Sequence, residues 1–272
     1  MSFPLRKAVV PGGGQVMLDP KWRTFRFVND STQLVSVSKI LGKYFPFDDK
    51  TVSETVAMKS GSTVEAVKAE WRKSAVLGTN VHNAIEARLL GKEVPPFTEV
   101  HGGENLFVPA AIKGLEKLTE SYDIIAQEAI IVSRKTNVAG VVDFVAKNKT
   151  TGKLMIGDWK TTASSLSSFR FGSFQTPAEG VLSHLPNSKG TRASLQVLML
   201  GHMMKLEGYS AIYGPEVNEE MEYGIINIGK SEKGGDVSVS FDRVVPEDIV
   251  PPDMRCEVTF NDVIRSVLLT FQ

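Results

Sequence analysis

Two aspartates and a lysine lie in a segment whose sequence predicts a β-hairpin. Residues 139–162 read AGVVDFVAKNKTTGKLMIGDWKTT, with two strand-like runs around a polar turn at residues 148–153. Asp143 and Asp158 are equally distant from the centre of this turn. A simple hairpin therefore places them opposite each other, with Cβ atoms about 5 Å apart. Lys160 follows Asp158 by two residues and projects from the same face of the strand.

These residue types at this spacing could bind a metal ion. Two facing carboxylates repel each other unless a positive charge lies between them, and a hard divalent cation such as Mg²⁺ or Mn²⁺ prefers oxygen ligands. Such a cation neutralises charge on a phosphate and lowers the pKa of a bound water, and a lysine can orient that water. The same residues also fit an exposed hairpin with scattered charges, and the segment alone does not separate the two interpretations.

Composition limits the classes of protein to which the chain can belong. Its 272 residues, 42% of them hydrophobic, are enough for one large globular domain. The single cysteine, Cys256, excludes an intrachain disulfide, a cysteine-rich zinc site and the four thiolates of a typical iron–sulfur cluster. Lys+Arg and Asp+Glu both number 31, so the net charge is zero. That balance argues against a uniformly basic protein but is compatible with a local basic groove.

Hydrophobic periodicity and turn residues predict the α/β elements that position the hairpin. Residues 1–20 are expected to form an extended arm, and residues 36–41 to begin a short helix capped by a serine. Helices are predicted over residues 51–75, 78–90, 108–121, 192–206 and 260–271. Strands are predicted over residues 24–28, 128–132, 140–147 and 154–161, and again from residue 223.

The sequence contains no recognisable export or membrane segment. Its first residues, MSFPLRKAVVPGGG, lack the apolar run of a signal peptide. The apolar stretch at residues 195–204 is interrupted by Gln196 and His202 and is too short to span a membrane. We therefore expect an intracellular protein without a membrane partner, cytoplasmic rather than in the mitochondrial matrix, and not secreted.

Several motifs, in order along the chain, resemble a known nuclease family. They are SVSKIL at 36–41, GTNVHNAIE at 78–86, Glu128 at a strand start, GVVD ending at Asp143, and DWKT at 158–161. Together they resemble the RecB-type PD-(D/E)xK nucleases, most of all the mitochondrial genome maintenance exonuclease family and its phage-encoded relatives. Gln196 lies where that family has Q-x-x-x-Y, but the tyrosine position is Leu200 here.

The resemblance covers approximately residues 30–210 and implies an α/β fold with a restriction-endonuclease-like core, a mixed central sheet flanked by helices. It divides a single domain into an N-terminal arm (1–30), a nuclease core (30–210) and a C-terminal extension of strands and a helix (211–272). The chain has no G-x-x-x-x-G-K-[ST] loop, so any helicase would be a separate protein.

The resemblance also implies which residues bind the metal and act in catalysis. The implied ligands of Mg²⁺, for which Mn²⁺ is expected to substitute, are Asp143, Asp158, the Trp159 backbone carbonyl, His82 and Glu128. The implied catalytic residues are Asp143, Asp158, Lys160 and His82. Glu86 shares a helix face with His82 and either orients it or is solvated. Glu128 could equally be a surface glutamate. A zinc-protease site is excluded because H-E-x-x-H is absent.

A further set of polar residues is expected to bind the substrate. It comprises Gln196, Thr161, Thr162, Ser164, Arg170, Arg192, Ser36 and Ser38, with Lys189 as an additional phosphate contact. Hydroxyl and backbone N–H groups bind phosphate without reading sequence. Phe169, Phe171 and Phe174 around Arg170 fit the stacking of single-stranded bases, although simple core packing explains them as well.

The expected function is a metal-dependent DNA exonuclease that hydrolyses phosphodiester bonds in replication, recombination or repair. Its substrate would be single-stranded or end-containing DNA, and a separate helicase or single-strand-binding protein could be a partner. An endonuclease or a 5′-to-3′ duplex exonuclease of a phage recombination system would use the same residues. A third interpretation is a non-catalytic DNA-binding protein that keeps a nuclease-like fold.

Overall fold

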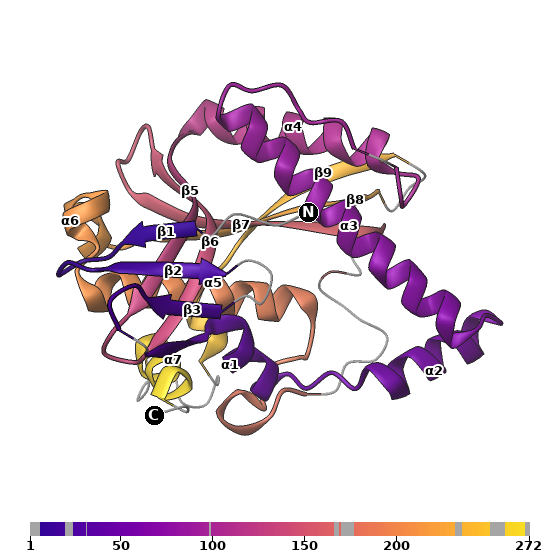
Figure 1. The fold of residues 1–272 in the computed structure, drawn as a ribbon, viewed down its shortest axis with the longest axis horizontal. Helices are drawn as coiled ribbons and strands as arrows, with labels where there is room; N and C mark the ends of the chain where they lie inside the picture. The colour runs from indigo at the N-terminus through magenta and orange to yellow at the C-terminus, as the bar shows by residue number, and fades with distance from the viewer. Residues whose placement is uncertain are drawn as a thin grey trace.

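The computed structural model describes residues 6–19, 24–30, 32–97, 99–165, 169, 177–231, 236–250 and 259–269 (Figure 1). The strands are β1 (Arg6–Val9), β2 (Gln15–Asp19), β3 (Thr24–Phe27), β4 (Gln33–Ser36), β5 (Tyr122–Ser133), β6 (Val138–Asn148), β7 (Leu154–Ser165), β8 (Glu222–Lys230) and β9 (Val237–Arg243). The helices are α1 (Val37–Tyr44), α2 (Asp49–Ser60), α3 (Val64–Leu89), α4 (Glu104–Ser121), α5 (Lys189–Glu207), α6 (Ser210–Tyr213) and α7 (Phe260–Leu269). Short 3-10 turns form η2 (Gly180–Leu182), η3 (Pro215–Asn218) and η4 (Pro246–Ile249).

The strands of the described chain form one mixed sheet of nine strands. Its order is β1-β2-β3-β4-β6-β7-β8-β9, and β5 pairs with β6 off this path. β1 to β4 form an antiparallel N-terminal ribbon, which joins β6 through a short parallel pairing of β4. β6 is paired with β5 along its whole length, so β4 and β7 share its other edge. β7 continues beyond β6 as a parallel partner of β8.

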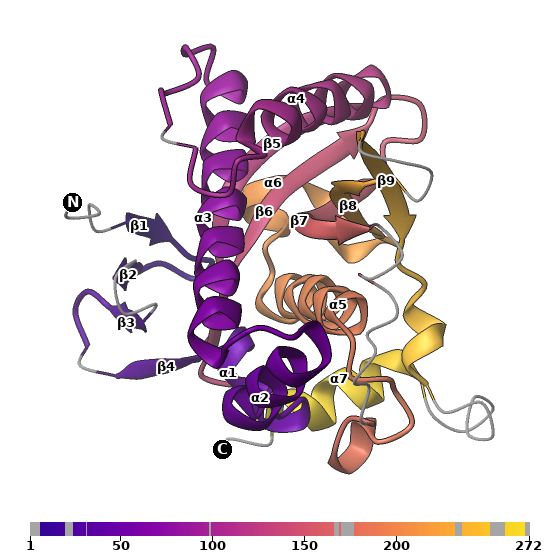
Figure 2. The same cartoon turned by 90° about the vertical axis from the view of Figure 1, so that its right-hand side faces the viewer.

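Helices cover both faces of the central sheet (Figure 2). On one face, α3 and α4 bury a cluster that includes Phe144, Trp159 and Ile226. On the other face, α1, α5 and α7 bury a larger cluster, in which every side chain from Val197 to Leu200 is fully buried. A third cluster joins the N-terminal ribbon to β5 and β6 through Ile130, Val132 and Ala139. The fold is therefore a mixed α/β sheet flanked by helices.

Two sequence predictions about local structure are wrong. The expected arm forms β1 and β2 over residues 6–19, because its alternating apolar residues pair as strands around the turn at residues 11–14. The helical region does not break between residues 75 and 78. The break lies at Gly61, which adopts φ 63° and ends α2, while Thr63 caps the start of α3 through the N–H of Ala66. Gly78 lies inside α3, where a single glycine only weakens a helix.

Other predicted elements are confirmed. Ser36 caps α1 by accepting the N–H of Lys39 at 3.1 Å, and α5 ends at Gly208 in the left-handed conformation. The hairpin of β6 and β7, the strands after residue 222 and the C-terminal helix are present. Across the described residues, no helix combines the length and apolarity that a membrane span requires.

Candidate functional site

The strands β6 and β7 separate at the two predicted aspartates. Their antiparallel pairing runs from Lys147 opposite Leu154 to Phe144 opposite Gly157. The next position in this register would place Asp143 opposite Asp158, which confirms the predicted alignment of the hairpin. At that point the backbone pairing stops, and the Trp159 N–H donates to Asp143 Oδ2 at 2.7 Å. A carboxylate therefore takes the place of a backbone acceptor where the strands part.

An aromatic ring fixes the hairpin immediately before this point. A Cβ atom at Gly157 would lie only 1.9 Å from Phe144 Cζ, so the ring occupies the space of the missing side chain. The same ring contacts Trp159, with ring centroids 5.5 Å apart. Because Gly157 directly precedes Asp158, this packing also sets the position of the carboxylate.

We expect Gly157→Ala to destabilise the protein by about 1–3 kcal/mol, the usual cost of forcing an extra carbon into a packed core. Urea unfolding followed by circular dichroism measures the change. Gly78→Ala is the matched control, since the added Cβ would lie more than 4 Å from any heavy atom other than those of its chain neighbours and its own helix backbone. In the interior of α3 it should be neutral or stabilising. Equal stability of Gly157→Ala and the wild type would contradict this account of the hairpin.

Three predicted metal ligands meet between α3 and the strands β5 and β6. His82 from α3, Glu128 from β5 and Asp143 from β6 each offer a ligand atom, and these atoms lie within 4.8 Å of one another. His82 Nδ1 is 3.8 Å from Glu128 Oε1 and 3.7 Å from Asp143 Oδ2. We call these three residues the metal triad. One imidazole nitrogen with two carboxylate oxygens is a donor set that could hold a divalent metal ion, and this mixed set does not by itself select the metal.

The second ring nitrogen of His82 has a backbone partner. Nε2 lies 3.0 Å from the Trp159 carbonyl oxygen, so Nε2–H donates to it and Nδ1 faces the triad. Although burial disfavours its charged form, the contacts with Glu128 and Asp143 raise the pKa of His82 to about 9. The two carboxyl groups thus favour a proton on Nδ1. A cation that binds Nδ1 must displace this proton.

The carboxyl groups of the triad differ in their surroundings. The Asp143 side chain is 12% exposed, and its burial together with the nearby charge of Asp158 raises its pKa to about 7. Burial acts in the same direction on Glu128, but its contacts with His82 and Arg6 outweigh it and lower the pKa. In the triad, the negative charge is therefore disfavoured on Asp143 and favoured on Glu128. A bound cation would relieve the repulsion between Asp143 and Asp158.

Glu128 lies inside β5, which begins at Tyr122, so the prediction that it starts a strand is wrong, and its backbone conformation is unusual. The flanking pairs, Gln127 with Phe144 and Ala129 with Val142, place it opposite Asp143. Its φ is 47°, in the left-handed region that non-glycine residues rarely adopt. Such strain is frequent at functional positions, where surrounding contacts must maintain it.

Asp158 and Lys160 form a pair beside the triad. The Asp158 side chain is only 1% exposed, its Oδ2 is ion-paired with Lys160 Nζ, and its Oδ1 accepts from Gln196 Nε2 at 3.3 Å. Asp158 is therefore held by Lys160 and Gln196 instead of belonging to the triad. The Trp159 carbonyl, which the sequence also predicts to bind the metal, accepts a hydrogen bond from His82 Nε2 instead.

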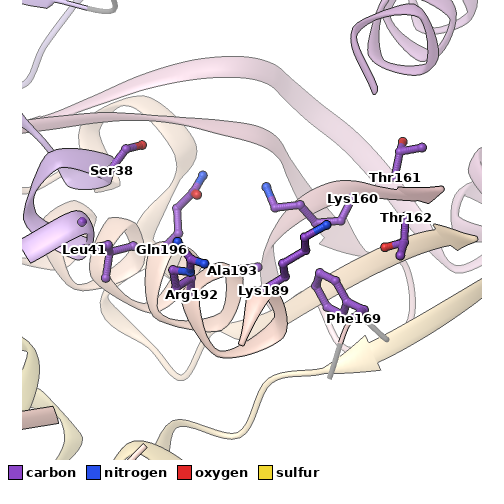
Figure 3. Close-up of a pocket in the computed structure, with 11 residues that line it drawn as sticks. Ser38, Leu41, Lys160, Thr161, Thr162, Phe169, Lys189, Arg192, Ala193 and Gln196 are labelled. Carbon is purple, nitrogen blue, oxygen red and sulfur yellow. The ribbon is translucent and has the colours of Figure 1, made fainter. Parts of the chain in front are cut away.

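A cavity of about 270 Å³ opens beside Lys160 (Figure 3). Its walls include the predicted substrate-binding residues Ser38, Thr161, Thr162, Arg192 and Gln196, together with Lys189, Phe169 and Leu41. Neither Lys189 nor Arg192 has an acidic partner among the described residues. Loss of surrounding water and the charge of Arg192 lower the pKa of Lys189. The cavity therefore contains cations that lack a neutralising anion from the described chain.

The hydroxyl groups of three predicted substrate-binding residues differ in their hydrogen bonds. Ser36 is occupied as the cap of α1, and Thr162 donates its hydroxyl to Asn227 Oδ1 at 2.9 Å. The buried Thr161 hydroxyl has no hydrogen-bond partner among the described residues.

Several predictions fall outside what the structure describes. Arg170, Phe171, Phe174 and Cys256 lie outside the described residues, as does the side chain of Ser164. Phe169, which is described, is buried against the cavity. Leu200, at the position of the family tyrosine, is fully buried in the core.

Sequence reasoning missed Arg6 and Asn227. Arg6 donates to Glu128 from β1, 122 residues away, and nothing in the local sequence of β1 indicates this contact. Asn227 lies inside β8 and is fully buried, and a buried asparagine within an apolar strand is a signal that could have identified it.

Comparison with known proteins assigns no family to the chain. No family model matches the chain, and no curated protein is significantly similar to it.

Proposed function

We propose that the protein is a metal-dependent nuclease that hydrolyses phosphodiester bonds in DNA, with an exonucleolytic mode on single-stranded or end-containing DNA. The proposal includes a restriction-endonuclease-like core formed by β5 to β8 with α3 and α5. One observation carries it: the strands β6 and β7 part at Asp143 and Asp158, with a histidine–carboxylate triad on one side and Lys160 on the other.

The proposed metal would be held by His82, Glu128 and Asp143, with Asp158 adjacent. When bound, it would supply a positive charge that stabilises the phosphate transition state and lowers the pKa of a water. The chain's own residues provide the remaining functions. Lys160 Nζ orients the attacking water or stabilises developing negative charge. Asp158 holds Lys160 through their ion pair, and Gln196 holds Asp158 through a hydrogen bond.

The cavity supports a phosphate-bearing substrate. Lys189 and Arg192 present two cations beside Lys160, and Ser38 adds an exposed hydroxyl to the cavity wall (Figure 3). Contacts of this kind bind a nucleic-acid backbone without reading its sequence. They also agree with a net charge of zero, because basic groups gather in the cavity while carboxylates gather around the triad.

The test compares linear and circular single-stranded DNA of the same sequence. With Mg²⁺ or Mn²⁺ the protein is expected to degrade the linear strand and spare the circle, and removal of the metal with EDTA should stop the reaction. Degradation of the circle would replace the exonuclease assignment with an endonuclease. Failure to cut any DNA, despite measurable Mn²⁺ binding, would reject the nuclease proposal.

A further inference from the structure

The N-terminal ribbon reaches the metal triad through one side chain. Arg6, the first residue of β1, donates from Nη1 to Glu128 Oε2 at 2.9 Å and from Nη2 to the Glu128 backbone carbonyl at 3.1 Å. Both arms of the guanidinium therefore bind the same residue. A planar fork with two donors fixes orientation in a way that a lysine ammonium does not.

One of these bonds holds the backbone of Glu128 and the other holds its carboxylate. The bond to the carbonyl holds the peptide that follows the strained residue, whose φ is 47°. The bond to Oε2 engages one carboxylate oxygen and leaves Oε1 facing His82 Nδ1 at 3.8 Å. Arg6 thus holds the carboxylate in an orientation in which one oxygen is engaged by the guanidinium and the other faces His82.

The position of Arg6 is itself fixed by contacts away from the triad. The ribbon packs on Ile130, Val132 and Ala139 of the central sheet. Arg134 binds its first turn by donating to the Gly13 carbonyl at 3.0 Å, and its guanidinium lies 4.2 Å from the centre of the Phe27 ring. Arg6 and Arg134 therefore both join the ribbon to the sheet, but only Arg6 contacts the triad.

We propose that Arg6 is a positioning residue of the metal site: its fork holds Glu128 in the conformation that presents Oε1 to a divalent cation. This inference rests on the proposed function, because it assumes that the triad binds a metal. It makes the N-terminal ribbon a part of the site. Partners that hold a metal ligand in place commonly contribute about 10–100-fold to metal affinity.

The experiment measures Mn²⁺ affinity by electron paramagnetic resonance in the full chain, without DNA. Arg6→Gln and Arg6→Lys are each expected to weaken Mn²⁺ binding about tenfold. The lysine variant keeps the positive charge, but its ammonium group cannot make both bonds to Glu128. Arg134→Gln is the matched control and should leave Mn²⁺ affinity within twofold of wild type. Thermal unfolding temperatures establish that all variants are folded.

A double substitution separates positioning from a general electrostatic effect. In a Glu128→Gln background, Arg6→Gln should weaken Mn²⁺ binding no further, because its effect passes through Glu128. Unchanged or tighter Mn²⁺ binding in Arg6→Gln would overturn the inference, tighter binding meaning that Arg6 competes with the cation. An equal loss in Arg134→Gln would overturn it as well, in favour of general docking of the ribbon. A wild type that binds no Mn²⁺ would instead reject the proposed function.

Discussion

Asp158→Asn is expected to reduce Mg²⁺-dependent DNA cleavage by about a thousandfold or more. The substitution preserves the volume of a side chain that is only 1% exposed, and the amide oxygen can still accept from Gln196. It removes the negative charge that faces Asp143 and pairs with Lys160. Without this charge the proposed metal loses an adjacent anion and Lys160 loses its partner, and a combined loss of about 4 kcal/mol of transition-state stabilisation corresponds to a thousandfold in rate.

Steady-state cleavage of linear single-stranded DNA measures this loss. Glu120→Gln is the control, since Glu120 is exposed on α4 and also loses one carboxylate charge. Mn²⁺ binding to Asp158→Asn should be weaker than to wild type, while Glu120→Gln should match the wild type in both assays. If Asp158→Asn kept more than a tenth of the activity at saturating Mg²⁺, Asp158 would have no essential role in the reaction.

Lys160→Met is expected to lower kcat by about 10²–10³-fold, the usual cost of removing one group that stabilises developing charge. Its effect on the metal should have the opposite sign to that of Asp158→Asn. Loss of a cation beside Asp158 and near Asp143 increases the local negative charge, so Mn²⁺ affinity should stay the same or rise. Methionine keeps most of the length of the lysine stem, which limits changes in packing.

Single-turnover cleavage at saturating Mn²⁺, together with a separate Mn²⁺ titration, distinguishes the two roles. Lys160→Arg is the companion variant, and it should retain more activity than Lys160→Met because it keeps a positive charge. Parallel losses of Mn²⁺ affinity and of rate in Lys160→Met would mean that the lysine supports the metal site and has no direct part in the chemistry.

The hairpin could be predicted because its information is local. A polar turn and two strand-like runs are enough to set the register, and the register determines which residues face each other. The alignment of Asp143 with Asp158 was therefore readable from the sequence, as was the serine cap of α1. The histidine was also found, but only through its motif, since its distance to Asp143 depends on how α3 crosses the sheet.

The missed features depend on contacts between distant segments. The Arg6–Glu128 pair joins positions 122 residues apart, and its partners become neighbours only when the ribbon packs on the sheet. The helix break was misplaced for a different reason. Gly61 and Gly78 are alike in the sequence, but only Gly61 is followed by a residue, Thr63, that caps a new helix. The sequence places Glu128 on a strand, but it does not predict that the backbone of this residue is left-handed.

The backbone of Trp159 offers a direct way to observe the site. The N–H of Trp159 donates to Asp143, and its carbonyl accepts from His82, so main-chain atoms on both sides of this residue contact the triad. These contacts do not depend on the identity of the side chain at this position. The amide resonance of Trp159 in a ¹H–¹⁵N spectrum of the ¹⁵N-enriched protein is therefore a built-in reporter of whether Asp143 binds a metal, and no substitution is needed at the site.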